Sequence, residues 1–363
     1  MHIQPISRSL SVLVAIASAV ALAGCNTDNP GPVSARHMQP LSDRIVADLE
    51  IRNMAKESPI LVRVFKEESE LEVWKIDNTG RFALLRTYPI CRWSGDLGPK
   101  LREGDRQAPE GFYTITPDLM NPNSSSYLAI NTGFPNAYDQ ANGRTGQFLM
   151  IHGDCSSAGC YAMTDEQIAE IYALAREAFF AGQNSFQVQA YPFRMTPLNM
   201  ARHRNSPHMA FWRMLKQGYD HFEVTRQEPK IDVCDRHYVF DAQSSDRFSP
   251  AGHCPACSVP QEIASAVHNK ERRDEAQFAQ FVIRGVPTIP TTTGAQGGMN
   301  ATYLAALKAN GGPGSDIRTA SGTIPGYVRP PTEQSPGLST IGLSHITSPA
   351  PGSSQEYQAP PVE

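Results

Sequence analysis

Short apolar runs dominate the first half of the chain, and their pattern predicts strands. The runs are rich in Val, Ile, Leu and aromatic residues, which favour the half-buried surface of a sheet. Asn78-Thr79-Gly80 separates two of the runs and indicates a hairpin turn. Short strands at such close spacing predict a mostly antiparallel sheet. The predicted strands are 60–66, 70–76, 82–90, 110–117, 126–131, 146–152 and 185–191.

Other segments carry apolar residues at helical spacing. The clearest helix begins after Thr164, a good N-cap whose capping-box partner is Gln167. Its apolar positions recur as far as Phe179, and Gly182 is a suitable terminator. The predicted fold class is therefore mainly β with flanking helices. Further helices are predicted at 43–56, 199–217 and 261–281.

The beginning of the chain is typical of an export signal. Arg8 precedes an apolar run over residues 10–23, which is shorter than the roughly 20 residues of a membrane-spanning helix. The run ends in Leu22-Ala23-Gly24-Cys25, which resembles the bacterial lipobox. We therefore predict a signal peptide at 1–24 and a lipid on Cys25. An ordinary signal peptide that happens to end near a cysteine is the alternative.

The lipid predicts a location in the periplasm, with the chain anchored to the cell envelope. Asn26 follows the lipid-bearing cysteine and favours the outer membrane. Residues 26–57 are interpreted as a linker with a short helix, and 226–285 as a cysteine-containing, α-helical extension. From Val286 onward Pro, Gly, Ser and Thr dominate, so 286–363 is predicted to be a disordered tail.

Length and charge narrow the possible functions. The chain has 363 residues, of which 41–285 are enough for one ordinary domain with an extension. The formal net charge is −4 and no long run of Lys or Arg occurs, so nucleic-acid binding is not predicted.

Seven cysteines occur, and outside the cytoplasm disulfides between them would persist. Cys234 and His237, together with Cys254-Pro-Ala-Cys257, have a spacing that could hold zinc. For an exported chain we favour a disulfide from Cys234 to either Cys254 or Cys257 over zinc. We expect neither a metal nor a cofactor.

The stretch IHGDCSSAGCYAMTD, residues 151–165, carries the candidate chemistry. It lies between a predicted strand and the helix capped by Thr164, where loops expose side chains and backbone N–H groups. Cys160 could be a nucleophile with His152 as its base. A Cys155–Cys160 disulfide is an alternative, and a zinc site formed by His152, Cys155 and Cys160 is another.

Longer blocks show a resemblance. His152-Gly153 followed by Ser157-x-Gly159-Cys160 resembles the signature of L,D-transpeptidases with a YkuD-type catalytic domain. The block GDLGPKLREGDRQAPEGFYTITP, residues 95–117, resembles the block that precedes this signature in the family. Residues 131–146 and 191–196 resemble its YafK-like branch. The resemblance implies a YkuD-like β-sandwich or barrel as catalytic domain, assigned to 58–225.

The resemblance also implies roles for the residues of the signature. Cys160 would be the nucleophile and His152 its base. Gly159, Tyr161 and Ser157 would shape the turn or help to form an oxyanion hole. Most of the family carries a second His before the Gly-Cys, where this chain has Ala158. His152 would then act alone, and a backbone carbonyl or the Gly153 peptide would have to orient it.

Basic side chains in the matching blocks are candidate contacts to the carboxylates of the substrate. They are Arg144, Lys100 and Arg194, each of which is more often a structural or solvated charge.

The implied reaction is acyl transfer at meso-diaminopimelate in peptidoglycan stem peptides. An amine acceptor would make a cross-link, and water would instead make the enzyme a hydrolase of peptidoglycan–peptide or peptidoglycan–lipoprotein links. The implied partners are stem peptides, an envelope lipoprotein and the membrane that holds the lipid. A non-catalytic envelope-binding lipoprotein is the alternative from another functional class.

Overall fold

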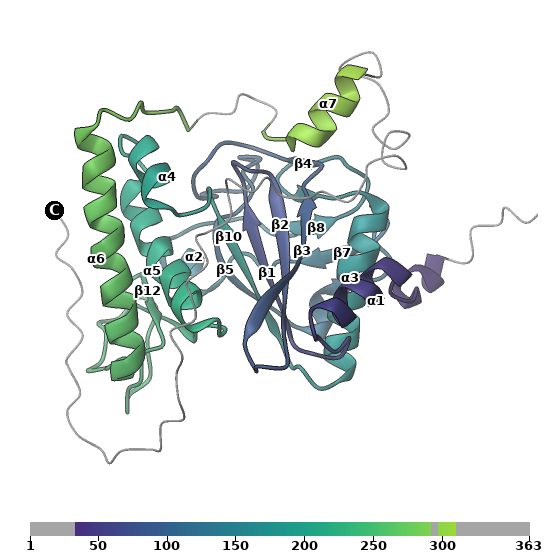
Figure 1. The fold of residues 1–363 in the computed structure, drawn as a ribbon, viewed down its shortest axis with the longest axis horizontal. Coiled ribbons are helices and arrows are strands. Elements are labelled where there is room, and N and C mark those ends of the chain that lie inside the picture. Colours follow the sequence, from purple (N-terminus) through teal and green to yellow (C-terminus); the bar gives the residue numbers. More distant parts are fainter. Residues whose placement is uncertain (1–32, 292–296, 310–363) are drawn as a thin grey trace, which may run out of the picture.

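Two five-stranded sheets form the centre of the described part of the chain (Figure 1). The structure is a computed structural model that describes residues 33–291 and 297–309. The first sheet has the order β3-β2-β1-β10-β5, and only β1 and β10 run parallel in it. Its strands are β1 (Ile60–Phe65), β2 (Glu70–Ile76), β3 (Phe82–Pro89), β5 (Gly111–Ile115) and β10 (Phe186–Tyr191).

The second sheet has the order β4-β9-β8-β7-β6, and β8 and β9 form its parallel pair. The expectation of mostly antiparallel pairing is confirmed, as is the hairpin between β2 and β3. A separate hairpin joins β11 (Ile231–Cys234) to β12 (His237–Phe240). The strands of the second sheet are β4 (Arg92–Trp93), β6 (Met120–Asn121), β7 (Ala129–Asn131), β8 (Met150–His152) and β9 (Tyr161–Ala162).

Helices cover the sheets from two sides (Figure 1). On one side α3 (Asp165–Phe180) contacts β1, β7 and β8. It begins as predicted, because Thr164 and Gln167 form a complete capping box. On the other side lie α4 (Pro197–Arg202), α5 (Met209–Thr225) and α6 (Gln261–Ile283). The remaining helices are η1 (Val33–Met38), α1 (Asp43–Ile51), η2 (Pro117–Leu119), α2 (Ala137–Ala141) and α7 (Ala301–Ala309).

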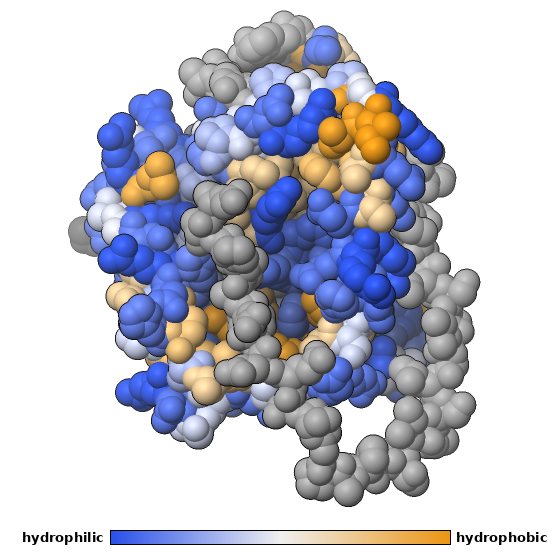
Figure 2. All heavy atoms as spheres, turned by 90° about the vertical axis from the view of Figure 1, so that its left-hand side faces the viewer, coloured by the Kyte–Doolittle hydropathy of each residue, from blue (hydrophilic) through white to orange (hydrophobic). Residues whose placement is uncertain are grey.

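The fold class is mainly β with flanking helices, as predicted from the sequence. One core unites the inner faces of both sheets with α3 and α5, and its largest buried side chains include Trp93 and Trp212. Helix α6 contacts α4 and α5 but buries Val267 alone. Figure 2 views the molecule from the α6 side and shows mainly hydrophilic residues there. Within residues 33–291 and 297–309, no helix has the length and apolarity needed to cross a bilayer.

The predicted helix at 199–217 is wrong in its extent. The structure has α4 ending at Arg202 and α5 starting at Met209. Pro207 lies between them, and a proline excludes the residue before it from helical conformation. The predicted helix at 43–56 also ends early, at Ile51, since Asn53 has a left-handed φ of 55°.

The predicted disordered tail from 286 is also wrong for part of its length. Residues 286–291 and 297–309 are placed against the domain. Ile289 N–H donates to the Arg202 carbonyl at 2.9 Å, and α7 follows residues that pair with Trp93. The sequence does not predict this docking. The apolar periodicity of the segment is weak, and the residues that it contacts are far away in the sequence. Residues 310–363 and the predicted signal segment 1–24 with Cys25 lie outside the described residues.

Two disulfides decide between most of the cysteine pairings that the sequence left open. Cys91 pairs with Cys155, and Cys234 pairs with Cys254 rather than Cys257. The sequence prediction of a Cys234 disulfide is thus confirmed, with Cys254 as the partner. The Cys155–Cys160 alternative is wrong, because Cys155 is bonded to Cys91. Cys160 and Cys257 are free thiols.

Candidate active site

The parallel pair β8–β9 brings Cys160 and His152 to the same part of the second sheet. His152 is registered with Ala162, so the residue beside Cys160 is Met150. The Met150 N–H donates to Cys160 Sγ at 3.4 Å. Since alternate residues of a strand point to the same side, His152 and Met150 share a face of β8. The parallel pairing thereby brings His152 and Cys160 to neighbouring positions of the second sheet.

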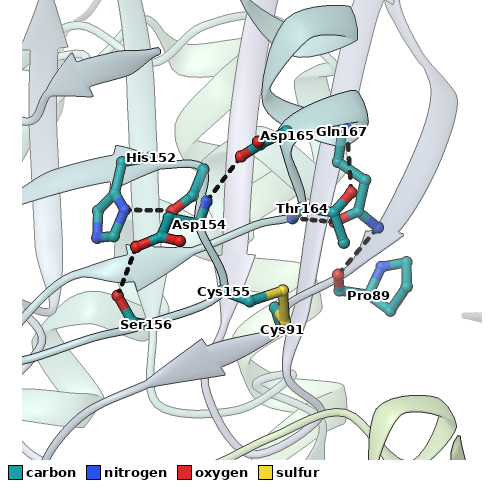
Figure 3. Close-up of a disulfide and its surroundings, with 10 residues drawn as sticks. Pro89, Cys91, His152, Asp154, Cys155, Ser156, Thr164, Asp165 and Gln167 are labelled. Atoms are coloured by element: carbon teal, nitrogen blue, oxygen red, sulfur yellow. Dashed lines mark hydrogen bonds between the residues drawn. A yellow bond between two sulfur atoms is a disulfide. The ribbon is translucent and has the colours of Figure 1, made fainter. Parts of the chain in front are cut away.

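A single hydrogen bond fixes the imidazole. His152 is buried, and its Nδ1 lies 2.6 Å from the Gly153 carbonyl oxygen (Figure 3). A carbonyl oxygen only accepts, so Nδ1 carries the hydrogen and Nε2 keeps its lone pair. Burial lowers the pKa of His152, against smaller raising effects of the Gly153 bond and the Asp154 charge. The Gly153 carbonyl thus fixes the tautomer of His152 in which Nε2 is free to accept a proton.

The surroundings of Gly153 leave no room for a side chain at this position. A Cβ on Gly153 would come within 2.5 Å of Asp165 Oδ1 and 2.9 Å of the Ser126 carbonyl oxygen. Its N–H donates to the Ser126 carbonyl at 3.1 Å, and the next N–H, of Asp154, donates to Asp165 Oδ1 at 2.9 Å (Figure 3). Asp165 belongs to the first turn of α3. The helix therefore anchors the peptide that orients His152.

The thiol of Cys160 is partly exposed and protonated at rest. Burial raises its pKa, while the Met150 N–H and the Lys100 charge lower it. A neutral thiol beside a neutral imidazole avoids the cost of two charges in a half-buried site.

A serine pair closes the turn that carries the thiol. Ser157 Oγ donates to the Cys160 carbonyl at 2.6 Å and accepts from the Cys160 N–H at 3.0 Å. Ser94 Oγ lies 2.7 Å from Ser157 Oγ and accepts from the Gly159 N–H at 3.0 Å. Gly159 has a φ of 129°, which side chains rarely tolerate. Ser157 and Gly159 therefore hold the shape of the turn.

This arrangement corrects one expectation about the oxyanion hole. The N–H groups of Gly159 and Cys160 both donate to serine hydroxyls within the turn. They can serve a substrate oxygen only after those bonds open or through the hydroxyls themselves. Sequence reasoning missed Ser94, which lies 63 residues from Ser157 and carries no motif that ties it to the turn. The side chain of Tyr161 points away into the core, where its hydroxyl donates to the Pro109 carbonyl at 2.5 Å.

All three predicted substrate-binding cations are buried and paired with carboxylates within the chain. Arg194 is buried between Glu70 and Glu72, with 2.8 Å from its Nη1 to Glu72 Oε1. Arg144 Nη1 lies 2.8 Å from Asp139 Oδ1, and both residues are buried. A buried ion pair is costly to break. The geometry therefore gives the predicted substrate contacts of Arg144 and Arg194 no support.

Lys100 is near enough to the Cys160 thiol to influence its pKa. Its Nζ is 2.6 Å from Asp105 Oδ1 and 5.9 Å from the centre of the Phe134 ring. Its positive charge is one cause that lowers the pKa of Cys160. Of the three cations, Lys100 alone acts on the thiol through its field.

The disulfide Cys91–Cys155 braces the loop between His152 and the serine turn (Figure 3). Cys155 N–H donates to the Met163 carbonyl, and Cys91 N–H donates to the Ala162 carbonyl. Both bonds run to the segment that follows Cys160. The disulfide thus joins the loop at Cys155 to the residue before β4, and the backbone bonds hold both cysteines next to β9.

Comparisons with known proteins agree with this geometry. The YkuD family, described as the L,D-transpeptidase catalytic domain, matches residues 60–188. A protein of Escherichia coli (strain K12), named provisionally as L,D-transpeptidase YafK, is 48% identical over 190 residues, which cover 52% of this chain and 77% of that protein.

Matches to solved structures were also found. A mutant of the helical cell shape determining protein Pgp2 from Campylobacter jejuni matches with a TM-score of 0.31 and 23% identity, over 44% of this chain and 57% of that one. This chain thus spans little more than half the length of that structure. Bd1075 from Bdellovibrio bacteriovorus matches with a TM-score of 0.27 and 15% identity, over 53% of this chain and 94% of that one.

Proposed function

This chain belongs to the L,D-transpeptidase family and carries its YkuD catalytic domain, and we propose that it modifies peptidoglycan by cysteine-dependent acyl transfer. The observation that supports this proposal most is the pairing of a free, partly exposed thiol with a neutral, oriented imidazole on adjacent strands. In this proposal Cys160 is the nucleophile and His152 the base. The substrate is the stem peptide of peptidoglycan at meso-diaminopimelate.

The first half of the proposed reaction forms a thioester. The thiol proton moves to His152 Nε2 as Cys160 Sγ attacks the carbonyl carbon of the diaminopimelate residue. The C–N bond of the next amide then breaks, and imidazolium His152 returns the proton to the leaving amine. The Gly153 carbonyl supports this step, because its bond to Nδ1–H becomes stronger as the ring becomes charged.

The second half releases the acyl group. An amine that enters the site gives its proton to His152 and forms a new amide, while the Cys160 thiol is regenerated. Water in the same place would form a carboxylate, so the same site can act as a hydrolase. Which acceptor prevails depends on whether an amine is held in line and water is kept out.

The proposed location is the periplasm, with a lipid on Cys25. The two disulfides support export, because disulfides persist in oxidising compartments and are rare in the cytoplasm. The rival interpretation as a non-catalytic binding lipoprotein would have gained support from a Cys155–Cys160 disulfide. The structure instead leaves Cys160 free.

The deciding experiment compares the chain with Cys160→Ala on isolated peptidoglycan, scored by mass spectrometry. We expect new cross-links or released peptides or proteins that depend on Cys160. New amide products would identify a transferase, and new carboxyl termini a hydrolase. Equal products from both proteins, with the Cys160 thiol confirmed as free, would refute the proposed function on this substrate.

A further inference from the structure

A segment far beyond the family match is docked against β4, next to the serine that bonds the turn at 157–160. We call residues 297–303 the strap. Gly298 pairs antiparallel with Trp93, and each residue donates its N–H to the carbonyl of the other at 3.0 Å. Just before the strap, the Thr291 carbonyl accepts from the Leu97 N–H at 3.0 Å. The chain therefore contacts the catalytic domain on both sides of Ser94.

Side chains at the strap show a built interface rather than a loose contact. Asn300 is 3% exposed, and its Nδ2 donates to the carbonyls of Glu68 and Ser69 at 3.3 and 3.2 Å. Its N–H donates to the Ile90 carbonyl at 3.2 Å. A Cβ at Gly298 would lie 2.4 Å from the Trp93 ring, so only glycine permits this approach.

The end of the strap covers the disulfide. Tyr303, the third residue of α7, is buried in a cluster with Cys91, Cys155 and Met299. The strap therefore contacts two parts of the chain that hold the loop at 153–160 in place. They are the backbone at Trp93, next to Ser94, and the Cys91–Cys155 disulfide.

Ser94 connects the strap to the nucleophile. Its neighbour Trp93 is clamped by Gly298, and its own hydroxyl holds the Gly159 N–H and lies within 2.7 Å of Ser157 Oγ. Ser157 in turn holds both backbone groups of Cys160. A displacement of β4 would pass through these bonds to the thiol. Errors of about 1 Å at a reacting atom can cost around a hundredfold in rate.

We propose that the strap is a positioning element for the nucleophile and acts on Cys160 through Ser94. This inference deepens the proposed function, on which its kinetic test rests. Neither Ser94 nor the strap reacts. They hold the turn at 157–160 in the geometry that places the Cys160 thiol beside Met150 of β8.

The test uses the full chain and small changes. Asn300→Ala removes the amide donors, and Asn300→Asp removes them while keeping the side-chain size. Lys308→Ala, at an exposed position of α7, is the matched control. We expect the Asn300 variants to lower kcat about tenfold with KM within about twofold, because a loosened turn impairs chemistry more than binding. Lys308→Ala should match the unaltered chain.

Coupling to Ser94 distinguishes positioning from a general loss of stability. If the strap acts through Ser94, then Ser94→Ala and Asn300→Ala are not additive, and the double variant is little slower than the slower single variant. Independent, multiplying effects would overturn the proposal. So would an unchanged kcat in both folded Asn300 variants.

Hydrogen exchange separates this proposal from the proposed function. The Gly159 and Cys160 amides should exchange faster in the Asn300 variants than in Lys308→Ala, whatever the substrate is. If Cys160→Ala shows that the reaction is absent, the exchange result still decides the inference. Unchanged exchange at both amides in the Asn300 variants would overturn it.

Discussion

At the scale of single residues, the site depends on which group carries each proton. His152 is held neutral by burial, with its hydrogen on the nitrogen that faces the Gly153 carbonyl. Cys160 is held neutral by burial as well. The side chains of His152 and Cys160 are therefore both neutral at rest, in contrast to an ion pair of thiolate and imidazolium. The proposed mechanism requires a neutral imidazole, so protonation of His152 is expected to stop the reaction.

The pH dependence of activity follows from this state. As the pH falls through the pKa of His152 the ring becomes charged and kcat/KM falls. Because burial lowers that pKa, activity should persist to a more acidic pH than the ordinary pKa of histidine would allow. A pH profile of kcat/KM checks this expectation. An acid limb at or above the ordinary histidine pKa would indicate a resting ion pair instead.

How far a sequence predicts such a site depends on the distance between its parts. His152, Ser157 and Cys160 lie within one stretch, and the following carbonyl of Gly153 was an expected partner for the ring. Ser94 has no local signature, and its role appears only when β4 and β9 pair. Arg194 matched a family block, yet its buried partners Glu70 and Glu72 lie more than a hundred residues away.

At the scale of elements, one buried lysine organises the segment that leads to Lys100. Lys66, at the end of β1, is fully buried and its Nζ donates to Glu110 Oε1 at 2.9 Å. The carbonyl oxygens of Asp96, Gly98 and Ala108 also surround its Nζ, at 2.7, 3.2 and 3.1 Å, and share its remaining hydrogens. A segment without regular secondary structure is thereby fixed to the first sheet.

Removing this lysine should therefore be severe. In Lys66→Met the Glu110 carboxylate stays buried without its cation, and three carbonyls lose a donor. The free energy of unfolding should fall by about 3–5 kcal/mol, as measured by urea denaturation. The double variant Lys66→Met with Glu110→Gln should recover part of the loss. A fall below about 1 kcal/mol in the single variant would show that water replaces the ammonium group.

The elements that the sequence predicted well are those with local signals. The hairpin at Asn78-Thr79-Gly80 and the capping box of Thr164 and Gln167 are contained in a few neighbouring residues. Helix α7 lies in the segment predicted to be a disordered tail. The sequence does not reveal it, because the cluster that buries Tyr303 includes Cys91 and Cys155, which are far away in the sequence. Tertiary partners decide such an element, and propensity alone does not reveal them.

At the scale of the whole molecule, the two disulfides are expected to contribute differently to stability and to the site. The Cys91–Cys155 bond spans 64 residues and joins β4 to the catalytic loop, whereas Cys234–Cys254 spans 20 residues within the extension. A longer closed loop restricts the unfolded chain more. The first bond therefore contributes to both stability and the site, and the second to stability alone.

Replacing each pair by serine should separate these effects. Loss of Cys91–Cys155 should lower the free energy of unfolding by about 4 kcal/mol, and loss of Cys234–Cys254 by about 3 kcal/mol, in the chain-entropy account. Activity of the folded protein should fall only in the first variant. Chemical denaturation and kcat, measured on both, check the expectation. A larger loss of activity from the Cys234–Cys254 variant would contradict it.

The position of Gly298 has a consequence for how copies of this protein behave together. Strand β4 ends its sheet, and a bare outer strand offers unpaired backbone groups on which another chain can add a strand. Here Gly298 takes both the N–H and the carbonyl of Trp93. The molecule thus caps this edge of its own sheet, and a chain cut before Gly298 would expose an unpaired strand edge to which other copies could bind.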